Sequence, residues 1–120
     1  MLNYLDGNHM KEWVVAETTN ARVCTSDDYG KTIICSNGGD VAITLPANGA
    51  AAGSWIRFIR TVAKDLVVTA ATADTLIAPG DAAAKAVVFS DQLGAQCRVI
   101  SNGSVWIAIN ESDLTMTVTP

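Results

Sequence analysis

Few residues of this 120-residue chain are of the types that perform catalysis, and their spacing does not bring them together. His9 is the only histidine and lies in a polar N-terminal stretch, where nothing nearby could hold it as a general base. Asp27 and Asp28 are the sole adjacent carboxylates, but neighbours in a strand point apart, and this pair precedes Tyr29-Gly30 in a predicted turn. Phosphate-binding glycine loops, zinc-protease motifs and nucleophile elbows are absent. We therefore predict that the chain is not an enzyme.

The three cysteines, Cys24, Cys35 and Cys97, lie far apart, and neither a Cys-x-x-Cys spacing nor a second histidine completes a metal site. We expect them to be small buried side chains, although a disulfide between two of them stays open. Calcium would need several Asp or Asn oxygens at fixed offsets in one loop, and no loop supplies that pattern. The sequence thus predicts no cofactor and no resident metal ion.

Two arginines, Arg57 and Arg60, fall inside a predicted strand over residues 55–60 rather than in a loop. They either face solvent or pair with acidic groups of a partner, since Arg is enriched at protein–protein contacts. Trp13, beside the polar start of the chain, presents the same choice and is a candidate anchor to another chain. The residues expected at a subunit or partner interface are Trp13, Val14, Arg57, Arg60, Leu114, Met116 and Val118.

The composition is that of an all-β chain with more apolar surface than one small domain readily hides. Hydrophobic residues make up 49% and charged residues 17% of the chain, against about 25% charged in typical soluble domains. Val, Ile and Thr together supply 33 of the 120 residues, which excludes a helical bundle and a disordered chain. A net charge of −4 without a cluster of Lys or Arg argues against nucleic acid or an anionic membrane as the partner. We interpret the apolar excess as interface.

Short strand-like runs bounded by Gly, Asn, Asp or Pro recur along the chain and predict an antiparallel β-sandwich of about nine short strands, jelly-roll-like or β-tulip-like, over residues 26–120. Residues 1–25 are expected to form an extended N-terminal arm. One hairpin is predicted between residues 31–35 and 41–45, and a second between 95–100 and 105–109 through Asn102-Gly103. The final run, 114–119, alternates apolar residues with threonine and predicts an edge strand or a contact with a neighbouring chain.

The first ten residues lack a basic start followed by an apolar run, and no stretch approaches the roughly 18 consecutive apolar residues of a membrane span. We therefore expect the chain to be synthesised in the cytoplasm and to stay soluble there until it joins an assembly.

The order of several short motifs resembles the small β-structured modules of tailed-bacteriophage virions, which occur in head decoration (cement) proteins, head fibres, tail fibres and spikes. The resemblance covers roughly residues 27–110. The motifs that carry it are Tyr29-Gly30-Lys31-Thr32-Ile33, Ile43-Thr44-Leu45-Pro46-Ala47, Gly53-Ser54-Trp55-Ile56-Arg57-Phe58, Leu66-Val67-Val68-Thr69-Ala70 and Ser101-Asn102-Gly103-Ser104-Val105-Trp106. In fibres and spikes such modules are normally embedded in longer chains with repeats or a coiled coil. This sequence has neither, which favours a free-standing decoration protein.

The resemblance implies a homotrimer seated on the capsid surface of a virion, where it contacts the major capsid protein and stabilises the shell. The first alternative is a tail-fibre or head-fibre module that binds a host receptor or glycan, which would predict exposed aromatic residues in polar loops. A second alternative is a small β-fold hydrolase or lyase, which would need a clustered acid–base set that this sequence does not supply.

Overall fold

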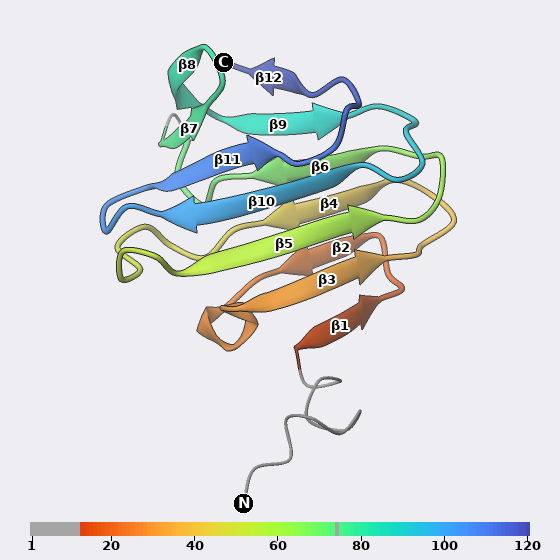
Figure 1. Cartoon of the computed structure of the whole chain (residues 1–120), viewed down its shortest axis with the longest axis horizontal. Helices are drawn as coiled ribbons and strands as arrows, with labels where there is room; N and C mark the ends of the chain where they lie inside the picture. Colours follow the sequence, from red (N-terminus) through yellow and green to blue (C-terminus); the bar gives the residue numbers. More distant parts are fainter. Residues whose placement is uncertain (1–12, 74) are drawn as a thin grey trace, which may run out of the picture.

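The computed structural model describes residues 13–73 and 75–120, and within these residues the protein is all-β, with two mixed sheets in a sandwich-like arrangement (Figure 1). We refer to the seven-stranded sheet, in the order β1-β3-β5-β10-β11-β7-β8, as the large sheet. The five-stranded sheet, in the order β12-β9-β6-β4-β2, is the small sheet. The strands are β1 (Val14–Glu17), β2 (Ala21–Val23), β3 (Lys31–Cys35), β4 (Val41–Thr44), β5 (Trp55–Arg60), β6 (Leu66–Thr69), β7 (Leu76–Ala78), β8 (Asp81–Ala84), β9 (Ala86–Phe89), β10 (Gln96–Ser101), β11 (Trp106–Asn110) and β12 (Thr117–Thr119).

From β1 to β6 the chain changes sheet at every strand. β1, β3 and β5 lie side by side and parallel in the large sheet, and β2, β4 and β6 do the same in the small sheet. Each of the pairs β1–β2, β3–β4 and β5–β6 therefore makes one winding around the core, and the three windings stack in one direction. The later strands extend both sheets, mainly by antiparallel pairing of β10 with β5 and of β9 with β6.

The expected antiparallel sandwich is therefore corrected to a mixed one, with twelve strands in the described residues instead of about nine. The parallel pairs also separate this topology from a jelly roll, whose sheets are antiparallel. The hairpin predicted between residues 31–35 and 41–45 is wrong, because β3 and β4 belong to different sheets. The second predicted hairpin is confirmed: β10 and β11 pair antiparallel, and Gly103 at their turn has a φ of 96°.

The N-terminal part of the chain differs from the expected arm over residues 1–25. Residues 14–17 and 21–23 are strands β1 and β2, which pair with β3 and β4 and so belong to the two sheets. The first twelve residues of the expected arm lie outside the described residues. Val14 and Val15 have the β-branched side chains that favour a strand, and this explains why the sheets begin so early in the sequence.

One apolar core fills the space between the sheets. Ile33, Phe58 and Val99 come from the large sheet and Val68 and Phe89 from the small sheet, and all five are fully buried.

Trp106 of β11 is the largest buried side chain, and its indole Nε1 donates a hydrogen bond to the Pro46 carbonyl at 3.0 Å. The Tyr29 ring packs edge-on against the Trp106 ring, with 5.7 Å between their centroids. The polar end of the indole thus has a partner, as burial of this side chain requires.

The described residues contain a single helical segment, the 3-10 turn η1 (Ser26–Asp28). Thr25 and Asp28 cap it reciprocally, because the Thr25 amide donates to Asp28 Oδ2 at 3.1 Å and the Thr25 hydroxyl accepts from the Asp27 amide at 3.3 Å. The Asp28 carboxylate therefore shapes a turn, to which Asp27 contributes its backbone amide. No helix in the described part of the chain is long and apolar enough to cross a membrane.

Ile33 and Ile34 of β3 test which face of the large sheet is the core. Ile33 is fully buried and Ile34 is half-buried on the opposite face. We expect Ile33→Ala to lower the free energy of unfolding by about 2–5 kcal/mol, because it leaves a cavity, and Ile34→Ala to cost much less in the isolated chain. Denaturant unfolding of both variants checks this, and equal losses would contradict the assigned faces.

Candidate functional site

The outer face of the large sheet carries the largest group of partly exposed apolar side chains in the described structure. Alternate residues of β3, β5, β10, β11 and β7 point away from the core, and the residues between them are buried. We call the outward apolar group the isoleucine face. It consists of Ile34, Trp55, Ile59, Ile77, Ile100, Ile107 and Ile109.

The strand register makes one part of the isoleucine face a continuous row. Ile100 lies beside Trp55 on one side and Ile107 on the other, and Ile107 lies beside Ile77, so one row crosses four strands. Six of the nine isoleucines of the chain lie on this face, and only three lie in the core. Contiguous apolar patches on soluble proteins are characteristic of interaction sites, protein–protein contacts among them.

The outer face of the small sheet differs in composition. Its outward positions hold threonine, alanine and valine, with no isoleucine, leucine or tryptophan among the described strands: Ala21, Val23, Ala42, Thr44, Val67, Thr69, Val88, Thr117 and Thr119. The two outer faces are therefore unequal, and the isoleucine face is the stronger candidate for an interface.

A small ion cluster interrupts the isoleucine face. Arg57 Nε donates to Glu111 Oε1 at 2.8 Å, and Arg98 Nε lies 3.3 Å from Glu111 Oε2. The Arg57 guanidinium also lies over the Trp55 ring, with Cζ 5.3 Å from the centroid, and Gln96 Nε2 donates to Glu111 Oε1 at 3.3 Å. Hydrogen bonding from Arg57 lowers the pKa of Glu111 and the same bond raises the pKa of Arg57. Two guanidiniums thus share one carboxylate.

Arg60 does not belong to an interface, and this corrects its predicted role. It is fully buried, because it occupies an inward position of β5, whereas Arg57 occupies an outward one. Its guanidinium donates to the carbonyls of Cys35 at 3.0 Å and Asn37 at 2.8 Å, to that of Lys64 at 3.3 Å, and to that of Gly39. Arg60 therefore provides hydrogen-bond donors to backbone carbonyls near the points where the chain crosses between the sheets.

The remaining predicted residues lie in two places. Leu114, Met116 and Val118 are half-buried and pack against the core near the edge strand β12, which pairs with β9. Trp13 and Val14, at the start of β1, are 46% and 47% exposed.

Val23 of β2 is a further exposed apolar side chain at the end of the molecule that carries Trp13 and Val14, and it is 72% exposed. Sequence reasoning missed Val23 because the three-residue strand β2 was not predicted. Its signal was only the alternation of Ala21, Arg22 and Val23.

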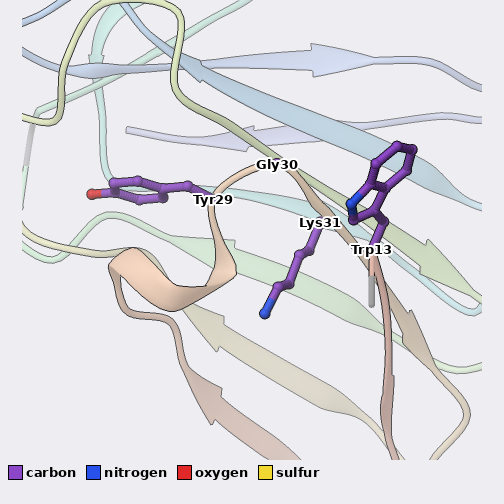
Figure 2. Close-up of a pocket in the computed structure, with 4 residues that line it drawn as sticks. All are labelled: Trp13, Tyr29, Gly30 and Lys31. Atoms are coloured by element: carbon purple, nitrogen blue, oxygen red, sulfur yellow. The ribbon is translucent and has the colours of Figure 1, made fainter. Parts of the chain in front are cut away.

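A shallow hollow opens beside β1 and is lined by Trp13, Tyr29, Gly30 and Lys31 (Figure 2). Lys31 begins β3, and the Thr32 amide donates to the Trp13 carbonyl at 2.9 Å, which holds Trp13 next to that strand. An exposed indole beside a lysine fits a protein side chain or a sugar ring better than it fits catalysis.

Three carboxylates from different loops also converge. Asp40 precedes β4, Asp65 precedes β6 and Asp91 follows β9, and their oxygens lie within 4.8 Å of one another. The sequence did not show this cluster, because its members are 25 and 26 residues apart and meet only through the neighbouring positions of β4, β6 and β9. Two of the carboxylates accept backbone amides, Asp40 from Asp65 at 3.1 Å and Asp65 from Asp91 at 3.0 Å. Such a cluster can attract a hard cation or simply cap the loops.

The cysteines behave as expected from the sequence. Cys24, Cys35 and Cys97 are free and buried. Burial raises the pKa of their thiols to about 12, 11 and 12 respectively. They are therefore poor nucleophiles at neutral pH.

Comparison with known proteins gives no relative: no family profile, no curated protein and no solved structure matches this chain.

The contrast between the two arginines of β5 can be measured. We expect Arg60→Met to lower the free energy of unfolding by at least about 2 kcal/mol, because buried carbonyls lose a charged donor. Arg57→Met is expected to cost less than about 1 kcal/mol, since its ion pair is partly exposed. Urea unfolding of both variants tests this. A larger loss of unfolding free energy for Arg57→Met than for Arg60→Met would contradict the structural role of Arg60.

Glu111 should add an acid-sensitive contribution to stability. Its pKa is lowered from an ordinary value of 4.5, so the contribution is complete above that pH and is lost as pH falls through the lowered value. We expect the melting temperature of Glu111→Gln to lie below that of the unsubstituted protein at pH 7, and the two to converge at acid pH. A difference that grows on acidification would contradict the pairing.

Proposed function

We propose that this chain is a structural virion protein that assembles through the isoleucine face and decorates a phage capsid, which it stabilises by binding the major capsid protein as an oligomer. The observation that carries the proposal is the isoleucine face itself, with six isoleucines and Trp55 left partly exposed on one side of the fold. The resemblance of the motif order to phage virion modules suggests the capsid as the place where the protein acts. In that setting the protein has no catalytic role, needs no cofactor, and resides on the virion surface.

The proposed mechanism is stabilisation by mass action. A protein that binds an assembled lattice, but not its separated parts, stabilises the lattice, and many weak contacts per shell multiply the effect. A broad apolar surface suits this role, because it provides contact area without demanding a deep pocket. The proposal keeps two further expectations from the sequence, a β-tulip-like module and an N-terminal arm, restricted to the residues before β1, that reaches the shell.

The ion cluster bears on the symmetry of the proposed oligomer. Arg57 and Arg98 share only Glu111, so the middle of the isoleucine face has an excess of positive charge. A two-fold contact that placed this cluster against its own copy would oppose like charges. A cyclic, head-to-tail contact avoids that opposition and is compatible with the homotrimer that the resemblance implies.

The alternative function is a tail-fibre or head-fibre module that binds a host receptor or glycan. The observation that favours it is the hollow beside Trp13, where an exposed indole lies near Tyr29 and Lys31. Aromatic rings of this kind are suited to sugar faces, so the test of the proposal includes a glycan arm.

One pair of variants tests the proposal. Ile59→Lys puts a charge on the isoleucine face, and Val67→Lys puts the same charge on a half-buried outward position of the small sheet. We expect the unsubstituted protein and Val67→Lys to co-sediment with expanded phage capsids, and Ile59→Lys to lose at least about tenfold in affinity, because a charge must be desolvated in the contact.

Circular dichroism melts confirm that both variants are folded. Equal capsid binding by the two variants would contradict a role for the isoleucine face. Binding of the unsubstituted protein to host cell-surface glycans, without binding to capsids, would favour the fibre module.

A further inference from the structure

The two sheets have four edges, and those at one end of the molecule are protected against pairing with other chains. β8 and β12 lie at the upper end in Figure 1. A register shift between Leu76 and Ala78 distorts the β7–β8 ladder, the Lys85 amide next to β8 donates to the Thr119 carbonyl of β12 at 2.8 Å, and Pro120 follows β12. Bulges, covering contacts and proline are the usual means of blocking an edge strand.

The opposite end, formed by β1 and β2, has a different surface. The described residues include four large hydrophobic side chains that are strongly exposed, and three of them, Trp13, Val14 and Val23, lie at this end. Neither β1 nor β2 contains a lysine, a proline or a bulge. This end therefore combines exposed apolar side chains with strand edges that lack the usual protection.

Of the two edges, β2 is already partly occupied. The Thr19 hydroxyl donates to the Ala21 carbonyl at 2.9 Å. Arg22 points inward and bridges Glu17 and Asp28 at 2.9 and 2.7 Å, which closes the gap between the sheets. Inward charges of this kind disfavour addition of another strand to β2.

Among residues 13–73 and 75–120, no strand pairs with the second side of β1. The backbone groups that face β3 include those of Trp13, which precedes β1, and Glu17, which ends it. The Trp13 carbonyl accepts a hydrogen bond from the Thr32 amide at 2.9 Å, and the Glu17 carbonyl accepts one from the Ser36 amide at 3.0 Å. Because backbone groups alternate in direction along a strand, those of Val14 and Ala16 point away from β3. In the described part of the chain, β3 is the single neighbour of β1.

We infer that β1 is a self-association edge that pairs antiparallel with β1 of a second copy of this chain, around a two-fold axis at Val15. In this register Val14 faces Ala16 of the second copy, and the outward backbone groups of both residues form four hydrogen bonds across the axis. The large sheets of the two copies then become one continuous sheet.

A second copy fits this edge better than an unrelated strand for two reasons. The pairing is self-complementary, since the residues whose backbone groups point outward are symmetric about Val15. The same register brings Glu17 of each copy opposite Trp13 of the other, beside the hollow whose rim carries Lys31. Trp13 and Val14, two of the strongly exposed apolar side chains, therefore become covered.

The inference does not rest on the proposed function. Pairing through β1 uses an edge of the large sheet, whereas the proposed assembly uses its outer face. Ile59→Lys disrupts the proposed contact through the isoleucine face and is expected to leave β1 pairing unchanged. Assembly through the isoleucine face and pairing through β1 can therefore be tested independently.

Cysteine cross-linking tests the register directly. The three native thiols are buried and have raised pKa values, so they do not compete with an introduced cysteine. In the proposed pair the Cα atoms of residue 14 and residue 16 of the other copy are about 5.5 Å apart, a distance that a disulfide spans. We expect a mixture of Val14→Cys and Ala16→Cys proteins to form covalent dimers under mild oxidation at least about tenfold faster than Ala42→Cys, an exposed control on the small sheet.

A cross-linking rate no higher than that of the Ala42→Cys control would overturn the pairing, whether a foreign strand or the chain's own first twelve residues occupied the edge.

A second comparison uses Ala16→Pro and Ala16→Ser in the Ile59→Lys protein. Proline removes an outward amide without touching the β1–β3 ladder, whereas serine keeps the amide. Sedimentation equilibrium should show at least about tenfold weaker dimerisation for the proline variant. Equal dimerisation of the two variants would also overturn the pairing.

Discussion

Both faces of the large sheet carry large apolar side chains, and a fold of two sheets can bury only one of them. Successive residues of a strand point to opposite faces, so Ile33 enters the core while Ile34 faces outward, and β5, β10 and β11 repeat the same division. Strands that are apolar on both sides are characteristic of sheets covered on both sides. The outer face of the large sheet is thus built like a buried surface, and this property supports assembly more strongly than any single residue does.

The winding of the chain explains why that surface is broad. Alternation between sheets from β1 to β6 sets three parallel strands side by side in each sheet, and the β10–β11 hairpin extends the large sheet further. Each crossing leaves loop carbonyls near the core, and the buried guanidinium of Arg60 satisfies four of them. An arginine that resembles an interface residue in the sequence therefore stabilises the scaffold, and its neighbour Arg57 lies at the surface.

Local sequence patterns predicted most strands but not their partners. Short strand-like runs bounded by turn residues located β3, β4, β5, β6, β10 and β11, and Asn102-Gly103 correctly predicted a hairpin, because those signals act within a few residues. The failed hairpin between β3 and β4 shows the limit: a glycine-rich turn permits a reversal, but whether the chain re-enters the same sheet depends on contacts distant in sequence.

The candidate site likewise has features that the sequence predicted and features that only the fold reveals. The apolar character of residues 55–60 was visible in the sequence, whereas the separation of Arg57 from Arg60 depended on which face of β5 is buried. The continuity of Trp55, Ile100, Ile107 and Ile77 depended on strand order, as did the convergence of three aspartates, so neither could be derived from spacing along the chain.

The most direct measurement is the solvent exposure of isoleucine methyl groups in the full chain. Isoleucine-labelled protein can be titrated with a soluble paramagnetic probe at several protein concentrations, with Ile33, Ile43 and Ile56 of the core as internal references for burial. If chains assemble through the isoleucine face, its six isoleucines are as protected as these three in concentrated protein and become exposed on dilution. If the six are strongly relaxed by the probe at every concentration while the core three stay protected, the face is open to solvent and the account is contradicted.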